Sequence, residues 1–174
     1  MVEKAKYETV KKFDIIEIRK YPELLLAVVD GYGGDSGFSL LFNYISGNNK
    51  TQKKISMTAP VITSEKIKMT APVITGTEYM AFVMPETYSI DTIPQPNDSR
   101  VSIKKRPEKA YAVIRFSGVS NKKRIDKYSK QLFSEISKLE LKTKGEAILM
   151  RYNSPFAPGF IRRNELAIEI ESWG

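Results

Sequence analysis

The side chains that could do chemistry in this 174-residue chain are those of methionine, tyrosine, arginine, lysine and the carboxylates, because the sequence contains neither cysteine nor histidine. That composition excludes disulfides, thiolate metal sites and a cysteine nucleophile, and it removes the commonest metal ligand and general base. The sequence also lacks a Gly-rich phosphate loop and a Gly-x-Ser-x-Gly elbow. Glu165 with Tyr152 is one acid–base pair that an enzyme could still use. We predict a binding protein without catalytic residues.

One apolar helix face is the first candidate for ligand contact. Its side chains recur at spacings of three and four: Phe38, Leu41, Phe42 and Ile45. Asp35 or Ser36 can cap the start of this helix, and Gly47 can end it. Such a face either packs into the core or borders an apolar groove that holds a ligand.

A short repeat follows, in which residues 54–63 recur as residues 66–75. The spacing is twelve, an even number, so both copies of a strand present the same faces. Met57 and Met69 lie on the apolar face, where they either fill gaps in a core or line the wall opposite the helix. Pro60 and Pro72 cannot donate a ladder hydrogen bond, so each strand must be at an edge, bulged or bent there.

A polar run near the end of the chain, Arg162-Arg163-Asn164-Glu165, has two interpretations. It either clamps an anion, with Arg162 as a cation for the ligand, or orients a loop by pairing with local carboxylates and carbonyls. The residues alone leave both open.

The elements that must hold these residues come in the same order twice. In the first half, strands are predicted near 7–19, 24–29, 55–63, 67–75 and 79–84, with the helix after the second. In the second half, strands are predicted near 101–105, 110–116, 147–152 and 165–171. A long helix between them has an apolar stripe: Ile125, Tyr128, Leu132, Ile136 and Leu139.

The two halves also match residue by residue at an offset of 85 positions, as where Pro22-Glu23 corresponds to Pro107-Glu108. Each half therefore reads as a β-α-β-β unit with an open apolar sheet face, and two such faces can close on one core. We predict an α+β fold in a single domain, 1–174, with pseudo-repeats at about 7–90 and 100–172. The expected architecture is a distorted antiparallel barrel or sheet flanked by two helices.

Four ordered sequence blocks resemble the SOUL/heme-binding protein family. They are Met-Thr-Ala-Pro-Val at 69–73 and its duplicate at 57–61 with Phe-Val-Met-Pro at 82–85, the block at 112–118, the block at 151–156, and Arg-Arg-Asn-Glu at 162–165. Together they cover nearly the whole chain. The resemblance implies two β-α-β-β repeats and a similarity to gyrase-inhibitor-like effector-binding domains. It also implies that a tetrapyrrole binds in an apolar cleft beside the first helix.

Two departures from that family bear on heme. Some members are thought to place a His on the iron, and this chain has none, which leaves Met and Tyr as axial groups. Phe38 and Phe42 stand where better-known heme binders carry methionines and an arginine, and Asp35 puts an acid near the helix start. We therefore expect heme or another flat apolar ligand, with a protein-interaction or regulatory module as the alternative.

The formal net charge of +8 favours anionic ligands or a lysine-rich solvated surface. The basic segments lack interleaved aromatic residues, so we expect no specific nucleic-acid partner. The charged N-terminus and the short aliphatic run at 24–29 predict no membrane span. With no cysteine, a cytoplasmic location is expected.

Overall fold

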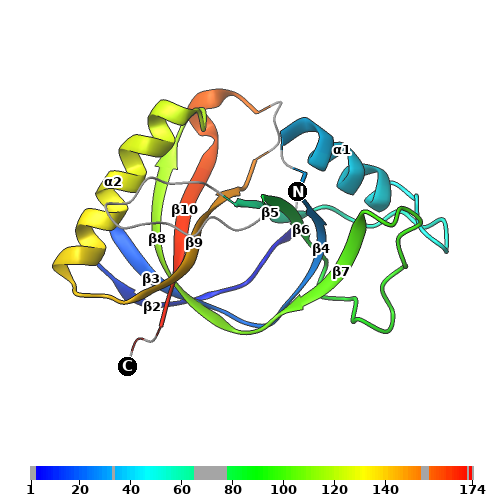
Figure 1. Cartoon of the computed structure of the whole chain (residues 1–174), viewed down its shortest axis with the longest axis horizontal. Coiled ribbons are helices and arrows are strands. Elements are labelled where there is room, and N and C mark those ends of the chain that lie inside the picture. Colours follow the sequence, from blue (N-terminus) through cyan, green and yellow to red (C-terminus); the bar gives the residue numbers. More distant parts are fainter. Residues whose placement is uncertain (1–2, 33, 65–77, 154–156, 172, 174) are drawn as a thin grey trace. The chain divides into compact units, whose positions relative to one another are not determined.

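The computed structural model describes residues 3–32, 34–64, 78–153, 157–171 and 173 (Figure 1). They divide into two compact units. Of the described residues, the first unit contains 3–5, 23–63 and 78–107, and the second contains 6–22, 64, 108–153, 157–171 and 173. Each unit is a mainly antiparallel sheet with one long helix, so the predicted α+β class is confirmed.

In the first unit, helix α1 packs on four antiparallel strands in the order β5-β6-β4-β7, and the short strand β1 runs parallel to β5. The bounds are β1 Glu3–Lys4, β4 Leu24–Asp30, α1 Gly34–Ile45, β5 Thr58–Ser64, β6 Tyr79–Val83 and β7 Val101–Arg106. The continuous apolar run of β4, residues 24–29, is buried at every position but Leu25. Its core includes Ala27 and Val29 of β4 and Phe82 of β6.

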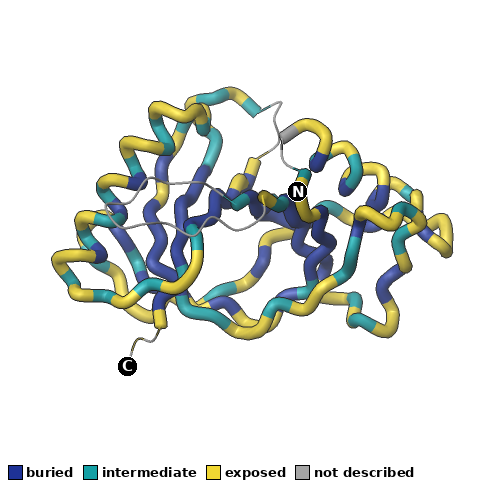
Figure 2. The backbone as a smooth tube through the Cα atoms, in the orientation of Figure 1, coloured by how far each residue is buried: buried dark blue, intermediate teal, exposed yellow. Residues whose placement is uncertain are grey.

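In the second unit, helix α2 packs on five strands in the order β2-β3-β8-β10-β9. The bounds are β2 Glu8–Lys12, β3 Ile16–Tyr21, β8 Lys109–Ser117, α2 Lys122–Lys138, β9 Thr143–Arg151, the 3-10 turn η1 Gly159–Ile161 and β10 Arg163–Ile170. The predicted stripe of α2 is confirmed, because Leu132 and Ile136 are buried in the core and the other three stripe residues pack against it. Around both helices buried and exposed residues alternate (Figure 2).

Each unit contains one β-α-β-β series, as predicted, and its sheet is completed from the other half of the sequence, by β7 in the first unit and by the β2–β3 hairpin in the second. β7 pairs with β4, and β3 pairs with β8. The 85-residue offset carries Ile16–Tyr21 onto Val101–Arg106, which are the bounds of β3 and β7. The leading strands of the two repeats are therefore exchanged, and this places residues 6–22 in the second unit. The single-domain organisation remains a prediction.

Of two strand predictions, one is wrong in detail and the other is confirmed. The segment 7–19, predicted as one strand, is a hairpin of β2 and β3, because the Phe13 N–H donates to the Ile16 carbonyl and closes a turn. In β5, the pairing with β6 shifts register between Thr58 and Val61, so the irregularity predicted at Pro60 is confirmed. The predicted strand at 67–75 lies outside the described residues. None of the described helices is both long and apolar enough to cross a bilayer.

Candidate functional site

The apolar face of α1 is divided between the core and solvent. Leu41 is fully buried and Ile45 is 6% exposed, and both belong to the core of the first unit. These two predicted site residues therefore pack against the strands of their own unit. Their side chains offer little free surface to a ligand.

The two phenylalanines of α1 form an aromatic stack that reaches the surface. Phe38 is partly buried and meets Phe82 edge-on, with ring centroids 5.4 Å apart. Phe42 stacks on Phe38, with ring centroids 5.9 Å apart and an interplanar angle of 14°. Its side chain is 50% exposed, so the outer end of the stack is open to solvent.

The remaining predicted site residues are placed differently. Met57 is partly buried and packs against the core that contains Leu41 and Ile45. Met69 lies outside the described residues. Arg162 belongs to the second unit, where its Nε donates to the Ala157 carbonyl at 2.9 Å. The structure thus brings Met57 together with the α1 face within one unit.

Among the described residues, the side chains that could ligate heme iron are those of methionine and tyrosine, and Met57 is partly buried against the core of the first unit. The sequence has no His or Cys, and Met80, Met84 and Met150 are buried. The Tyr44 hydroxyl donates to the Pro94 carbonyl at 2.5 Å, and burial, with the charge of Tyr88, raises the pKa of Tyr44 to about 12. A phenolate at Tyr44 is therefore disfavoured, and no described group of His, Cys, Asp or Glu side chains is arranged to hold a metal ion.

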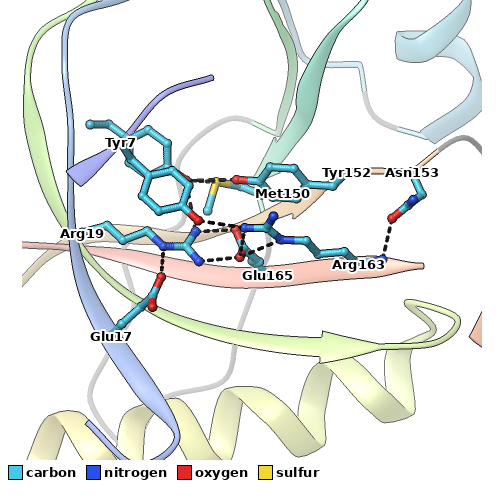
Figure 3. Close-up of polar contacts among 9 residues, drawn as sticks. Tyr7, Glu17, Arg19, Met150, Tyr152, Asn153, Arg163 and Glu165 are labelled. Atoms are coloured by element: carbon cyan, nitrogen blue, oxygen red, sulfur yellow. Dashed lines mark hydrogen bonds and ion pairs between the residues drawn. The ribbon is translucent and has the colours of Figure 1, made fainter. Parts of the chain in front are cut away.

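A buried polar cluster in the second unit is the other notable site (Figure 3). Glu165 on β10 is fully buried, and Arg19 on β3 is 2% exposed. Arg19 Nη1 and Nη2 donate to the two oxygens of Glu165 at 2.5 and 2.6 Å. Arg163 approaches from the other side, with its Nη2 2.9 Å from Glu165 Oε2. The carboxylate is thus held by two guanidinium groups, the arrangement that a buried charge requires.

Tyrosines surround this cluster. Arg19 lies over the ring of Tyr7 and Arg163 over the ring of Tyr152, each 4.1 Å from the centroid. The hydroxyl of Tyr21 is 3.0 Å from that of Tyr152. Glu17 accepts a hydrogen bond from Arg19 Nε. Two arginines and two glutamates therefore balance in charge.

The electrostatics keep the cluster ionised. Burial by itself would raise the pKa of Glu165, but the hydrogen bonds and charge of Arg19, with those of Arg163, outweigh it and lower that pKa. Burial would likewise lower the pKa of Arg19, and Glu165 reverses the direction. Burial, followed by the charge of Glu165, raises the pKa of Tyr152. Glu165 therefore stays ionised and Tyr152 stays protonated. Because their pKa values are shifted in opposite directions, the two residues do not form the acid–base pair considered from the sequence.

The contacts described for the polar run at 162–165 are with nearby side chains and carbonyls of the protein. Arg163 pairs with Glu165, its backbone N–H donates to Asn153 Oδ1 at 2.6 Å, and Asn164 Nδ2 donates to the Gly118 carbonyl at 2.7 Å. Arg19 was not among the site residues predicted from the sequence. Its signal was the alternation along β3, where Glu17, Arg19 and Tyr21 share the face opposite the apolar pair Ile16 and Ile18.

Comparison with known proteins gives one family. Residues 2–169 match the sequence model of the family described as SOUL heme-binding protein. No curated protein sequence matches the chain significantly.

Several solved structures share the fold at low sequence identity. The C-terminal domain of EcmrR is 9% identical with a TM-score of 0.61, and the match covers 96% of this chain and 99% of that one. A protein described as a hydrolase from Listeria innocua is 11% identical with a TM-score of 0.61, over 93% of this chain and 94% of that one. SAV2435 bound to tetraphenylphosphonium is 10% identical with a TM-score of 0.50, over 96% and 94%. At these identities the likeness concerns the fold alone.

Proposed function

The chain belongs to the SOUL heme-binding protein family, and we propose that it binds a flat, apolar, anionic ligand of the tetrapyrrole class on the outer face of α1. The observation that carries this proposal is the solvent-open stack of Phe42 on Phe38. Aromatic faces favour offset stacking with other π-systems, and a half-exposed Phe gains apolar burial when a flat ring covers it. Phe82 supports the stack from the core.

The segment after α1 supplies the cations for such a ligand. Lys50, Lys53 and Lys54 are all exposed. Asn49 fixes this segment to the last turn of α1, because its Nδ2 donates to the carbonyls of Tyr44 and Lys53 at 3.1 and 2.8 Å. Carboxylates of a ligand stacked on Phe42 would thus find lysines beyond the end of the helix. Asp35, in the first turn, would repel them from the other end.

The proposal assigns no role to iron. The contacts proposed above, to Phe42 and to the lysines after α1, involve the ring and its carboxylates and not the iron. Hemin and metal-free protoporphyrin should therefore bind with affinities within about threefold of one another, since a threefold ratio is less than 1 kcal/mol.

The test is a fluorescence and absorbance titration of the protein with metal-free protoporphyrin. Wild type should bind saturably at one equivalent, and Phe42→Asp should weaken binding at least about tenfold, because it removes a stacking surface and adds a charge that repels the ligand. The matched control is Phe160→Asp on η1, in the second unit. Phe160 is 81% exposed, and its substitution should leave binding unchanged. Equal losses in the two variants, or non-saturable binding by wild type, would refute the proposal.

We propose no catalytic role, because Glu165 is ionised with both oxygens engaged by arginines.

The second candidate function is a protein-interaction or regulatory module. It is favoured by exposed apolar side chains in the second unit, where Val119, Phe160 and Ile161 are 50%, 81% and 53% exposed. Failure of every porphyrin to bind, together with a partner lost on Phe160→Asp, would favour this module over the ligand-binding protein. We expect no specific nucleic-acid partner for either function.

A further inference from the structure

A small cavity is present in the second unit, whereas the α1 stack belongs to the first, and the cavity plays no part in the proposed function. Its volume is about 210 Å³, and it is lined by β2, the β2–β3 turn, β3 and β8. The lining includes the apolar side chains of Phe13, Ile15 and Val113. It also includes charged groups of both signs.

The charges around this cavity do not cancel. Lys12, Arg19 and Arg115 are opposed by Asp14 and Glu17 in the lining. Glu17 accepts from Arg19, whose other donors are engaged by Glu165 and Tyr21, so neither Arg19 nor Glu17 is free for a ligand.

Arg115 is one of two cations in the lining, with Lys12, that have no ion-pair partner among the described residues. It lies directly opposite Glu165 across the β8–β10 pair, but that carboxylate is already held by Arg19 and Arg163. Arg115 and Lys12 are both exposed. With Asp14 as the unpaired acid, the lining keeps an excess of one positive charge.

The size of the cavity restricts what it can hold. At roughly 30 Å³ per water, it has room for about seven waters, and an engineered cavity of about 150 Å³ already accepts benzene. A tetrapyrrole is far larger, since pockets for drug-sized ligands run from about 300 Å³ upward. The cavity is therefore of a size for a ligand with one ring or one short chain, and its positive charge favours a ligand with one anionic group.

We infer that this cavity binds a small organic monocarboxylate, with Arg115 as its principal counter-ion. The carboxylate accepts hydrogen bonds from the Arg115 guanidinium, in the fork geometry that arginine offers to carboxylates. Lys12 adds a second positive charge. The apolar body packs against Phe13, Ile15 and Val113.

The test uses three probes of nearly one shape and different charge: benzoate, benzamide and benzamidine. Their binding is followed in backbone amide NMR spectra of the full chain, at Thr9, Ile15 and Val113. The sole tryptophan, Trp173, meets Phe13 edge-on at 5.8 Å and gives a second, fluorescent readout. Benzoate should bind saturably, benzamide at least about fivefold more weakly, and benzamidine not at all, because charge-assisted hydrogen bonds are roughly twice as strong as neutral ones.

The variant is Arg115→Gln, for which we expect at least a tenfold loss of benzoate affinity. The matched control is Arg151→Gln, which removes the same charge from an exposed position on β9 outside the lining and should change the affinity less than twofold. Arg115→Lys keeps the charge without the fork and should fall between wild type and Arg115→Gln. It also provides a folded comparison if Arg115→Gln unfolds.

Three results would overturn the inference. They are benzamide binding as tightly as benzoate, equal losses in Arg115→Gln and Arg151→Gln, and benzoate shifts that never saturate. The porphyrin titration with Phe42→Asp concerns the first unit and is unaffected by each of these results. Failure here is therefore distinguishable from failure of the proposed function.

Discussion

Individual residues show how this protein keeps a buried carboxylate ionised. Glu165 accepts from Arg19 and Arg163, and Arg19 also binds Glu17. Removing one partner of a buried ion pair typically costs about 3–5 kcal/mol, because the remaining charge stays buried and unpaired. The cluster is therefore a structural joint between β3 and β10, which flank β8 on either side.

A pH series tests this assignment through Glu165→Gln. The folded pKa of Glu165 lies below its usual value of 4.5, so its stabilising contribution is present above 4.5 and is lost as the pH falls through the folded pKa. At neutral pH the variant should lose about 3 kcal/mol or more of unfolding free energy. In acid the difference from wild type should shrink, because the wild-type carboxyl also becomes neutral. Urea unfolding at several pH values measures it.

The matched control is Glu169→Gln, on the same strand. Glu169 pairs with Lys109 at 3.1 Å and is 23% exposed, so its loss should cost no more than about 1 kcal/mol. If the two variants lost equal stability, or if the loss at Glu165 did not depend on pH, Glu165 would not be an ionised partner of the arginines.

At the level of elements, a side-chain cap secures the N-terminus of α2. Asn121 caps α2, because its Oδ1 accepts from the Arg124 N–H at 2.9 Å. The first turn of α2 has no acidic residue and begins with Lys122 and Lys123, which oppose the helix dipole. The Asn121 cap therefore stabilises this terminus without help from charged side chains in the first turn.

Asn121→Ala should accordingly destabilise the protein by about 0.5–2 kcal/mol, the usual cost of losing an N-cap. Thermal and urea unfolding measure the loss. Ser134→Ala serves as the control, because Ser134 is exposed in the middle of α2 and alanine is the better helix former. A loss at Ser134 as large as that at Asn121 would mean that the cap is not the cause.

Sequence reasoning predicted these elements well wherever one face is apolar. The stripe of α2 and the buried run of β4 follow from periodicity alone. It erred at 7–19, where Phe13, Ile16 and Ile18 suggested one strand and the turn at Asp14 went unrecognised. Sequence reasoning also could not tell which residues of the α1 face are buried, because Leu41 and Phe42 are both apolar. Only the packing of the unit buries Leu41 and leaves Phe42 exposed.

At the level of the whole molecule, the internal repeat was visible in the sequence but the exchange of its leading strands was not. β3 and β7 occupy equivalent places in the two repeats, so the local pattern of each fits either sheet. Pairing is decided by long-range register, such as Ile16 opposite Ile114 and Val101 opposite Val29. The Arg19–Glu165 pair was hidden for the same reason, since it joins residues 146 positions apart.

The net charge of +8 acts on the whole molecule and draws anions toward it. Charge attracts many kinds of ligand, whereas the proposed contact with the Phe42 stack would favour a flat one. We therefore expect a porphyrin to bind at the Phe42 stack and not at other positively charged parts of the surface.

The most direct measurement is the set of intermolecular NOEs between metal-free protoporphyrin and the isotope-labelled protein. The account predicts NOEs from the porphyrin ring and methyl protons to the Phe42 and Phe38 rings, with the carboxylate side chains nearest Lys53 and Lys54. NOEs confined to the second unit, or contacts that leave Phe42 untouched at saturation, would contradict it.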